Sequence, residues 1–125
     1  MKDEVMKYKY DIKNIFAMII NEEIPCKKIY ETNLSLSFFD INPQAPIHAL
    51  VIPKGSYVNY DDFITNASVE QVIDYNNSII QTLKTLNIDL NENGNGYRLV
   101  VNNGNFASQE VPHFHTHILS GKKLD

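Results

Sequence analysis

His113-Phe114-His115-Thr116-His117-Ile118-Leu119 places an imidazole at every second position, and it holds three of the four histidines in the chain. Side chains alternate between the two faces of a β-strand, so a strand here would present all three histidines on one face. Neighbours on that face lie about 6.5–7 Å apart. The spacing therefore predicts a strand that carries a row of groups able to accept or donate protons near neutral pH.

Three interpretations of this histidine row are open from the residues alone. It can be half of a zinc site, because His-x-His on a strand is a common pattern of zinc ligands. It can be a nucleophilic centre, in which one imidazole attacks and the others position it and move protons. It can also be a histidine-rich surface strand without a role. The clustering of three histidines within five residues favours chemistry over the last interpretation.

The composition restricts the class of protein. A chain of 125 residues with 43% hydrophobic and 21% charged residues is typical of one globular domain. The net charge of −4 disfavours nucleic acid and anionic membranes as partners. We find no apolar run of about 18 residues that could span a bilayer, and no apolar signal segment at the start. The single Cys26 cannot form an intrachain disulfide, so we expect a cytoplasmic protein.

Turn signals and hydrophobic periodicity predict five strands and two helices. The expected strands cover Lys27–Glu31, Leu34–Phe39, His48–Pro53, Tyr97–Asn102 and His113–Leu119. Asn14 is suited to cap a short helix over Ile15–Asn21. Ser68 and Gln71 form a capping-box pattern at the start of a long amphipathic helix that ends near Asn87.

Several separated motifs resemble the histidine-triad (HIT) family, and in particular its Hint branch. They are His113–Leu119, Asn14-Ile15-Phe16, Glu23-Ile24-Pro25, Phe38–Pro46, His48–Lys54, Tyr97–Gly104 and Gln109–Pro112. The resemblance runs in family order from about Asn14 to Leu124. It implies an α+β fold in which a five-stranded antiparallel sheet is combined with two helices. It also implies a single HIT domain over residues 14–125, and we expect residues 1–13 to be a flexible N-terminal segment.

The resemblance implies a role for each histidine. His115 would attack the α-phosphorus of a nucleotide, while His113 would lie close to the phosphate and fix the tautomer of His115 through its carbonyl. His117 and His48 would complete a hydrogen-bonded chain that moves or stabilises protons. Without the resemblance, His48 would be interpreted as an ordinary core histidine.

The same resemblance implies a nucleotide-binding site. Asp40 would accept hydrogen bonds from the ribose hydroxyls, although an Asp at this place can equally stabilise a turn. Asn102 and Gln109 would donate to phosphate oxygens. Ile41, Phe16 and Ile24 would form the wall against the base, or simply belong to the core. Glu110 departs from the serine that many Hint members carry near the leaving group, and its carboxylate could repel a phosphate or bind a leaving amine.

The function implied is cleavage of purine nucleoside 5′-phosphoramidates through a covalent nucleotidyl-histidine intermediate, by a homodimer that needs no metal or other cofactor. The long helix and the strand Tyr97–Asn102 would be the dimer surfaces. Three alternatives stay open: a dinucleoside polyphosphate hydrolase, a nucleotide-binding regulatory module with incidental hydrolysis, and a zinc hydrolase that uses Glu110 as general base.

Overall fold

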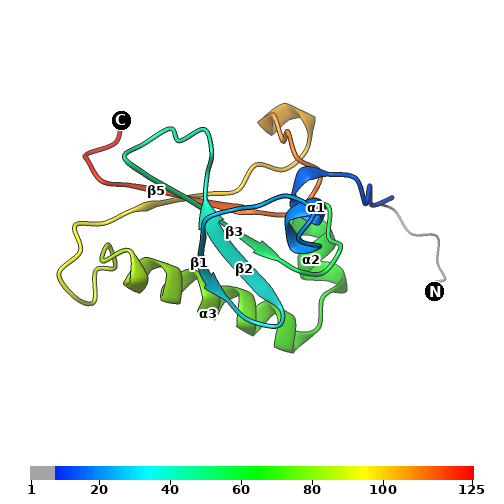
Figure 1. Cartoon of the computed structure of the whole chain (residues 1–125), viewed down its shortest axis with the longest axis horizontal. Helices are drawn as coiled ribbons and strands as arrows, with labels where there is room; N and C mark the ends of the chain where they lie inside the picture. The colour runs from blue at the N-terminus through cyan, green and yellow to red at the C-terminus, as the bar shows by residue number, and fades with distance from the viewer. Residues whose placement is uncertain (1–7) are drawn as a thin grey trace.

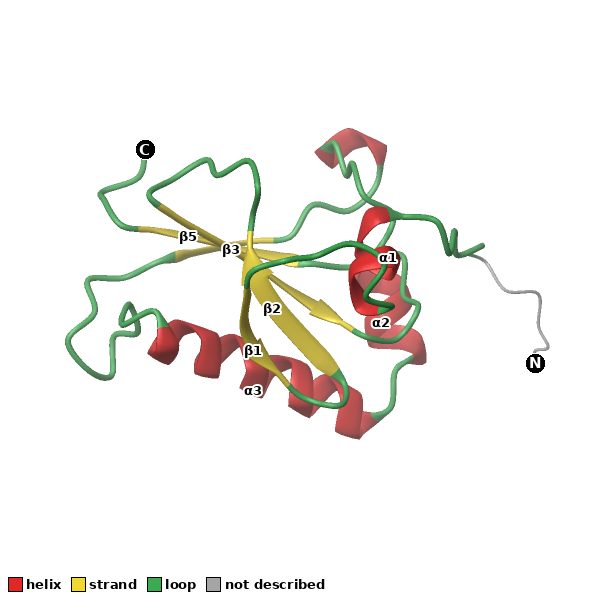
Figure 2. Ribbon diagram, in the orientation of Figure 1, coloured by secondary structure: helices red, strands yellow, loops and turns green. Residues whose placement is uncertain are grey.

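The structure is a computed structural model that describes residues 8–125, and it contains one antiparallel sheet with helices packed around it (Figures 1 and 2). The elements are α1 (Ile15–Ile20), β1 (Lys28–Glu31), β2 (Ser35–Phe39), β3 (Ile47–Pro53), α2 (Tyr60–Asn66), α3 (Val69–Thr85), β4 (Arg98–Val100), a 3₁₀ turn (Asn105–Ala107) and β5 (Thr116–Ser120). The strand order is β1-β2-β3-β5-β4, and every neighbouring pair is antiparallel. The predicted α+β fold with a five-stranded antiparallel sheet is confirmed.

Helix α1 begins where the sequence predicts. The Asn14 side chain accepts hydrogen bonds from the backbone N–H groups of Phe16 and Ala17, at 2.9 and 3.0 Å. These bonds satisfy two of the donors that a helix N-terminus leaves free. The helix holds Phe16 edge-on to Phe38 of β2, with ring centroids 5.7 Å apart. The cap thereby fixes an aromatic side chain against the sheet.

Helix α3 has the predicted capping box, in which Ser68 and Gln71 bond reciprocally. It packs along one face of the sheet against β1, β2 and β3 (Figure 1). The buried side of α3 is more polar than the periodicity indicates, because Thr82 faces the sheet and donates to Ser37 Oγ at 2.7 Å. The apolar side chains of Val69 and Ile73, in the first two turns of the helix, are 77% and 58% exposed. Hydrogen bonding between small hydroxyl side chains therefore replaces part of the expected apolar contact.

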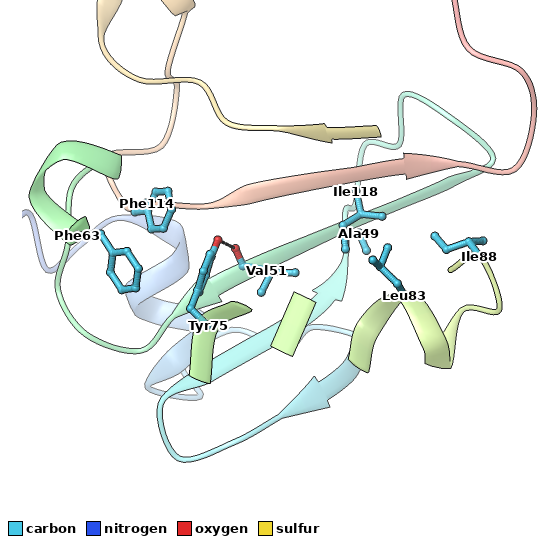
Figure 3. Packing of buried hydrophobic residues seen from close by; sticks show 8 residues of the cluster. All are labelled: Ala49, Val51, Phe63, Tyr75, Leu83, Ile88, Phe114 and Ile118. Atoms are coloured by element: carbon cyan, nitrogen blue, oxygen red, sulfur yellow. Dashed lines mark hydrogen bonds between the residues drawn. The ribbon is translucent and has the colours of Figure 1, made fainter. Parts of the chain in front are cut away.

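Helix α2 is an additional element that the sequence pattern did not predict. Asn59 caps it by accepting from the N–H of Asp62 at 2.8 Å. Phe63 on this helix stacks on Phe114, with ring centroids 4.9 Å apart, and both belong to the cluster of buried side chains in Figure 3. The cluster joins α2 and α3 to β3 and β5, and Phe114 lies just before the start of β5.

The strand expected over His113–Leu119 begins three residues later than predicted, at Thr116. The backbone N–H groups of His113 and Phe114, which precede the strand, make their hydrogen bonds outside the sheet. The N–H of His113 donates to the carbonyl of Val111 at 2.8 Å, and the N–H of Phe114 donates to the carbonyl of Tyr57 at 2.7 Å. These bonds hold the segment outside the ladder of the sheet, so the prediction of a continuous strand is wrong at this end.

Among residues 8–125, no helix is long and apolar enough to cross a membrane. The expected flexible segment 1–13 stays a prediction. Its residues 1–7 lie outside the described part of the chain, and its residues 8–13 lie within it.

Candidate active site

The four histidines meet where β3 and β5 lie side by side. His48 on β3 and His117 on β5 approach to 2.9 Å between Nε2 and Nδ1. The ring of His115 stands edge-on to that of His117, with centroids 5.0 Å apart. His113 is fully buried just upstream. The structure thus brings together all four predicted catalytic residues, although only His117 of the triad lies in a regular strand.

The tautomer of His115 follows from one contact. Its Nδ1 lies 2.6 Å from the carbonyl oxygen of His113, and a carbonyl can only accept, so Nδ1 carries the hydrogen. The Nε2 atom of neutral His115 then has a free lone pair, and it has no hydrogen-bond partner in the part of the chain described. Burial lowers the pKa of His115 below its ordinary value. The ring is therefore neutral near pH 7 and presents a nucleophilic nitrogen.

The backbone of the loop before β3 determines the tautomers of the other pair. The N–H of Gln44 donates to His48 Nδ1 at 2.9 Å, so neutral His48 carries its hydrogen on Nε2. That hydrogen points to His117 Nδ1, and His117 consequently carries its own hydrogen on Nε2. Burial, followed by the neighbouring His115 and His48, lowers the pKa of His117 to about 4. His117 thus offers an N–H donor beside the His115 lone pair.

The ring of His113 donates one hydrogen bond and accepts another. Its Nε2–H donates to the carbonyl of Pro53 at 2.8 Å, and its Nδ1 accepts from the hydroxyl of Tyr10 at 2.6 Å. Burial lowers the pKa of His113 to about 4, so both bonds involve a neutral ring. Tyr10 lies before the expected domain, and the sequence reasoning missed it. The available signal was a pair of tyrosines, Tyr8 and Tyr10, in a segment rich in charged residues.

We expect His113 to make the protein sensitive to acid. Its pKa is about 4 in the folded chain and about 6.5, the ordinary value, in the unfolded chain. Because the unfolded state takes up this proton first, the stabilisation is complete above pH 6.5 and is lost as the pH falls toward 4. The loss amounts to about 3 kcal/mol. Urea unfolding between pH 7 and 4 would measure it.

The control for this prediction is His113→Asn, which cannot titrate. We compare how steeply the free energy of unfolding changes with pH, and not its absolute value, because the variant also loses hydrogen bonds. The free energy of unfolding should fall less steeply with acid in the variant than in the wild type. Equal slopes would show that His113 does not contribute.

Asp40 lies beside His48 and contributes a carboxylate to the site. One carboxylate oxygen accepts from the N–H of Asn42 at 2.7 Å, and the other lies 3.4 Å from His48 Nε2. The side chain is 17% exposed and each oxygen has a second lone pair, so hydroxyl donors of a ligand can still reach it. The turn-forming interpretation and the ligand-binding interpretation of Asp40 are therefore compatible.

The three apolar residues expected at the base do not share one environment. Phe16 is buried and lies edge-on to His115, with centroids 5.0 Å apart. Ile24 is half-buried and packs against the buried apolar cluster that contains Phe16, whereas Ile41 is 83% exposed. Phe16 therefore adjoins the reactive ring, and Ile41 has a large apolar side chain without a covering partner among the described residues.

The loop before the triad requires one correction. Gln109 was expected to donate to a phosphate, but its two amide hydrogens already donate to the carbonyls of Val58 and Val111, at 2.7 and 3.1 Å. Its Oε1 accepts from the N–H of Gly104 at 2.9 Å. Gln109 thus holds the loop in shape, and these bonds leave no amide hydrogen for a ligand.

The other two residues expected here remain available for a ligand. Asn102 is half-buried, and its side chain makes no hydrogen bond within residues 8–125. Glu110 is exposed on the same loop. The amide hydrogens of Asn102 can therefore still donate to a phosphate oxygen, and the Glu110 carboxylate can still affect a leaving group.

Asp40, His48 and His117 each place one potential metal-ligand atom within 4.8 Å of the others. A metal needs a lone pair on each nitrogen. Because the Gln44 N–H occupies His48 Nδ1, the other nitrogen of neutral His48 carries a hydrogen and not a lone pair. A metal could bind there only after this hydrogen is lost or the Gln44 bond is broken. While the Gln44 bond is intact, neutral His48 therefore offers no lone pair to a metal at this cluster.

Comparisons with known proteins agree with this geometry. A family model described as the HIT domain matches residues 21–124, which include all four histidines. An uncharacterised HIT-like protein of Azospirillum brasilense is 44% identical over 119 residues, covering 95% of this chain and 94% of that protein. A HIT family hydrolase from Clostridium thermocellum matches with a TM-score of 0.80 and 34% identity, covering 90% of this chain and 94% of that chain. A histidine triad nucleotide-binding protein from Candida albicans matches with a TM-score of 0.74 and 34% identity, covering 85% and 73% of the two chains.

Proposed function

This chain belongs to the HIT domain family, and we propose that it is a nucleotide hydrolase of the Hint type that cleaves purine nucleoside 5′-phosphoramidates at the α-phosphorus. The observation that carries the proposal is the His115 Nε2 lone pair, which the bond from Nδ1 to the His113 carbonyl leaves free. The names of two similar structures, one a hydrolase and one a nucleotide-binding protein, support the same class of chemistry.

The reaction would proceed in two displacements. The anionic phosphate of the substrate raises the pKa of the adjacent imidazoles, and the His48–His117 pair takes up a proton. His115 Nε2 then attacks the α-phosphorus, the P–N bond breaks, and the leaving nitrogen takes the proton from the pair. The products of this step are an amine and a nucleotidyl-His115 intermediate.

Water completes the cycle. It attacks the phosphorus of the intermediate, and the bond from phosphorus to His115 Nε2 breaks. The proton of the water returns to the His48–His117 pair, and a nucleoside monophosphate leaves. The side chains assigned to the bound nucleotide are Asp40 for the ribose, Asn102 for the phosphate, and Phe16, Ile24 and Ile41 for the base. Gln109 would not contact the nucleotide and would instead maintain the conformation of the loop through its hydrogen bonds.

The experiment that tests the substrate class compares an adenosine phosphoramidate with diadenosine polyphosphates at equal concentration. We expect a higher kcat/KM for the phosphoramidate, because an amine leaves once it is protonated. A polyphosphate leaving group carries several negative charges and would be repelled by exposed Glu110. A higher kcat/KM for the dinucleotides would contradict the proposal that the protein is of the Hint type. Turnover of neither substrate would favour the alternative of a regulatory nucleotide-binding module.

We also propose that two copies associate through β4. This strand is at an edge of the sheet, with Leu99 45% exposed and the adjoining Val101 37% exposed. An unpaired edge with apolar side chains is a surface on which a second strand can pair. Light scattering should give about twice the 14.3 kDa of one chain. Leu99→Lys should shift the mass toward one chain, whereas Ile64→Lys, at an exposed position of α2, should not. A wild-type monomer would contradict the proposal.

A further inference from the structure

The carbonyl group that orients the ring of His115 lies outside the sheet. It belongs to His113 and accepts from His115 Nδ1 at 2.6 Å, whereas β5 begins only at Thr116. Hydrogen bonds between strands fix the backbone of a residue within a sheet, but no strand pairing in the described chain includes His113. Its N–H donates instead to the carbonyl of Val111 at 2.8 Å. The position of the His113 carbonyl therefore depends on how the ring of His113 is anchored.

Two groups anchor the ring of His113. Its Nε2 lies 2.8 Å from the carbonyl oxygen of Pro53 at the end of β3. A carbonyl can only accept, so the neutral ring has its hydrogen on Nε2 and a lone pair on Nδ1. The hydroxyl of Tyr10 lies 2.6 Å from Nδ1 and must be the donor of that bond. The two rings are also edge-on, with centroids 5.6 Å apart. Tyr10 therefore fixes both the tautomer and the orientation of His113.

The segment that carries Tyr10 is tied to helix α1. The side chain of Asn14, which caps this helix, also donates to the carbonyl of Asp11 at 2.8 Å. The N–H of Asn14 donates to the same carbonyl at 3.1 Å. Phe16 on the same helix stands edge-on to His113, with centroids 6.1 Å apart. The Tyr10 hydroxyl is thus presented by a folded turn that continues into a helix packed against the same ring.

Both partners of the contact keep their protonation state near neutral pH. Burial raises the pKa of Tyr10 above its ordinary value, and the nearby Asn14 side chain lowers it by less. The phenol therefore retains its hydrogen. The pKa of His113 is about 4, so its Nδ1 lone pair stays available. The bond consequently has the same donor and the same acceptor throughout the pH range in which His115 is a neutral nucleophile.

We propose that Tyr10 is a positioning residue for the reaction of His115. Its hydroxyl fixes the ring of His113, and the His113 carbonyl then keeps the hydrogen of His115 on Nδ1 and the lone pair on Nε2. The inference rests on the proposed function, in which this lone pair attacks phosphorus. Tyr10 precedes residues 21–124, which the family model matches, so the family comparison assigns it no role. Because Tyr10 acts through His113, its loss should slow the attack and leave nucleotide binding largely unchanged.

Tyr10→Phe tests the proposal, since it removes only the hydroxyl and keeps the edge-on ring. We expect kcat for an adenosine phosphoramidate to fall about three- to tenfold, as the loss of one hydrogen bond predicts. KM should stay within about twofold of the wild type. Tyr30→Phe is the matched control. Tyr30 is half-buried on β1, two strands away from β5, and its hydroxyl makes no hydrogen bond within residues 8–125. This control should keep the wild-type kcat.

The ring nitrogens supply a signature that a role in folding alone would not change. Long-range ¹H–¹⁵N spectra of the wild type without substrate should show hydrogen on Nε2 of His113 and on Nδ1 of His115. In Tyr10→Phe the two nitrogen shifts of His115 should converge as its tautomers mix. The wild-type spectrum also tests the geometry if the variant does not fold. Hydrogen on Nδ1 of His113 would then overturn the proposal.

The remaining outcomes separate this inference from the proposed function. Equal kcat in Tyr10→Phe and Tyr30→Phe would overturn the inference. A lower kcat with unchanged His115 shifts, or a loss of kcat/KM that comes from KM alone, would overturn it as well, because the hydroxyl would then act by another route. If the wild type turns over no phosphoramidate, the proposed function fails. Convergence of the His115 shifts in Tyr10→Phe would in that case still support the positioning of His115 by Tyr10.

Discussion

His115→Ala should turn over an adenosine phosphoramidate at least about a hundredfold more slowly than the wild type, because the substitution removes the nucleophile. The structure supports His115 as the nucleophile and not His113 or His117. His113 uses both ring nitrogens in bonds to Tyr10 and Pro53, and His117 Nδ1 accepts from His48. Only His115 combines a neutral ring with a lone pair that is free of other contacts.

The measurement has two parts. Single-turnover reactions of the wild type, quenched in alkali, should show the mass of a nucleotidyl group on the peptide that contains His115. His115→Ala should still bind the nucleotide, since Asp40 and Phe16 are unchanged. An adduct on another residue, or turnover within about tenfold of the wild type, would show that the assignment is wrong.

Much of the site could be predicted from the sequence because its chemistry depends on spacing along the chain. Alternate histidines before and within β5 place His115 and His117 ring to ring. His48 is different, because only the resemblance pointed to it and the pairing of β3 with β5 brings it to His117. The helix cap at Asn14 is likewise a local pattern, with its donors two and three residues away. Local patterns of this kind require no knowledge of the tertiary structure.

The failures of prediction concern contacts between distant parts of the chain. Gln109 was expected to bind phosphate, but its amide bonds the carbonyl of Val58, 51 positions earlier. Tyr10 bonds His113 across 103 positions. Neither the amide nor the hydroxyl indicates in the sequence which of many acceptors it will meet. The tautomer of His48 similarly depends on the backbone N–H of Gln44, which no side-chain motif reveals.

The unpredicted helix α2 should be important for stability, and Phe63→Ala tests this. Phe63 is 2% exposed, and its ring lies 4.9 Å from that of Phe114 and 5.2 Å from those of Tyr57 and Tyr75. Removing it leaves a cavity that rigid aromatic neighbours cannot fill. We expect a loss of about 3–5 kcal/mol in the free energy of unfolding, measured with urea.

The neighbouring Ile64→Ala is the matched control. Ile64 lies on the same helix but is 47% exposed, so its truncation should cost less than about 1 kcal/mol. Phe63→Ala should also lower kcat, because Phe114 stands between His113 and His115 and loses its stacking partner. Equal stability of the two variants would show that the aromatic cluster does not anchor α2. A destabilised Phe63→Ala with unchanged kcat would instead show that the hydrogen bonds of His113 alone maintain the geometry of the histidines.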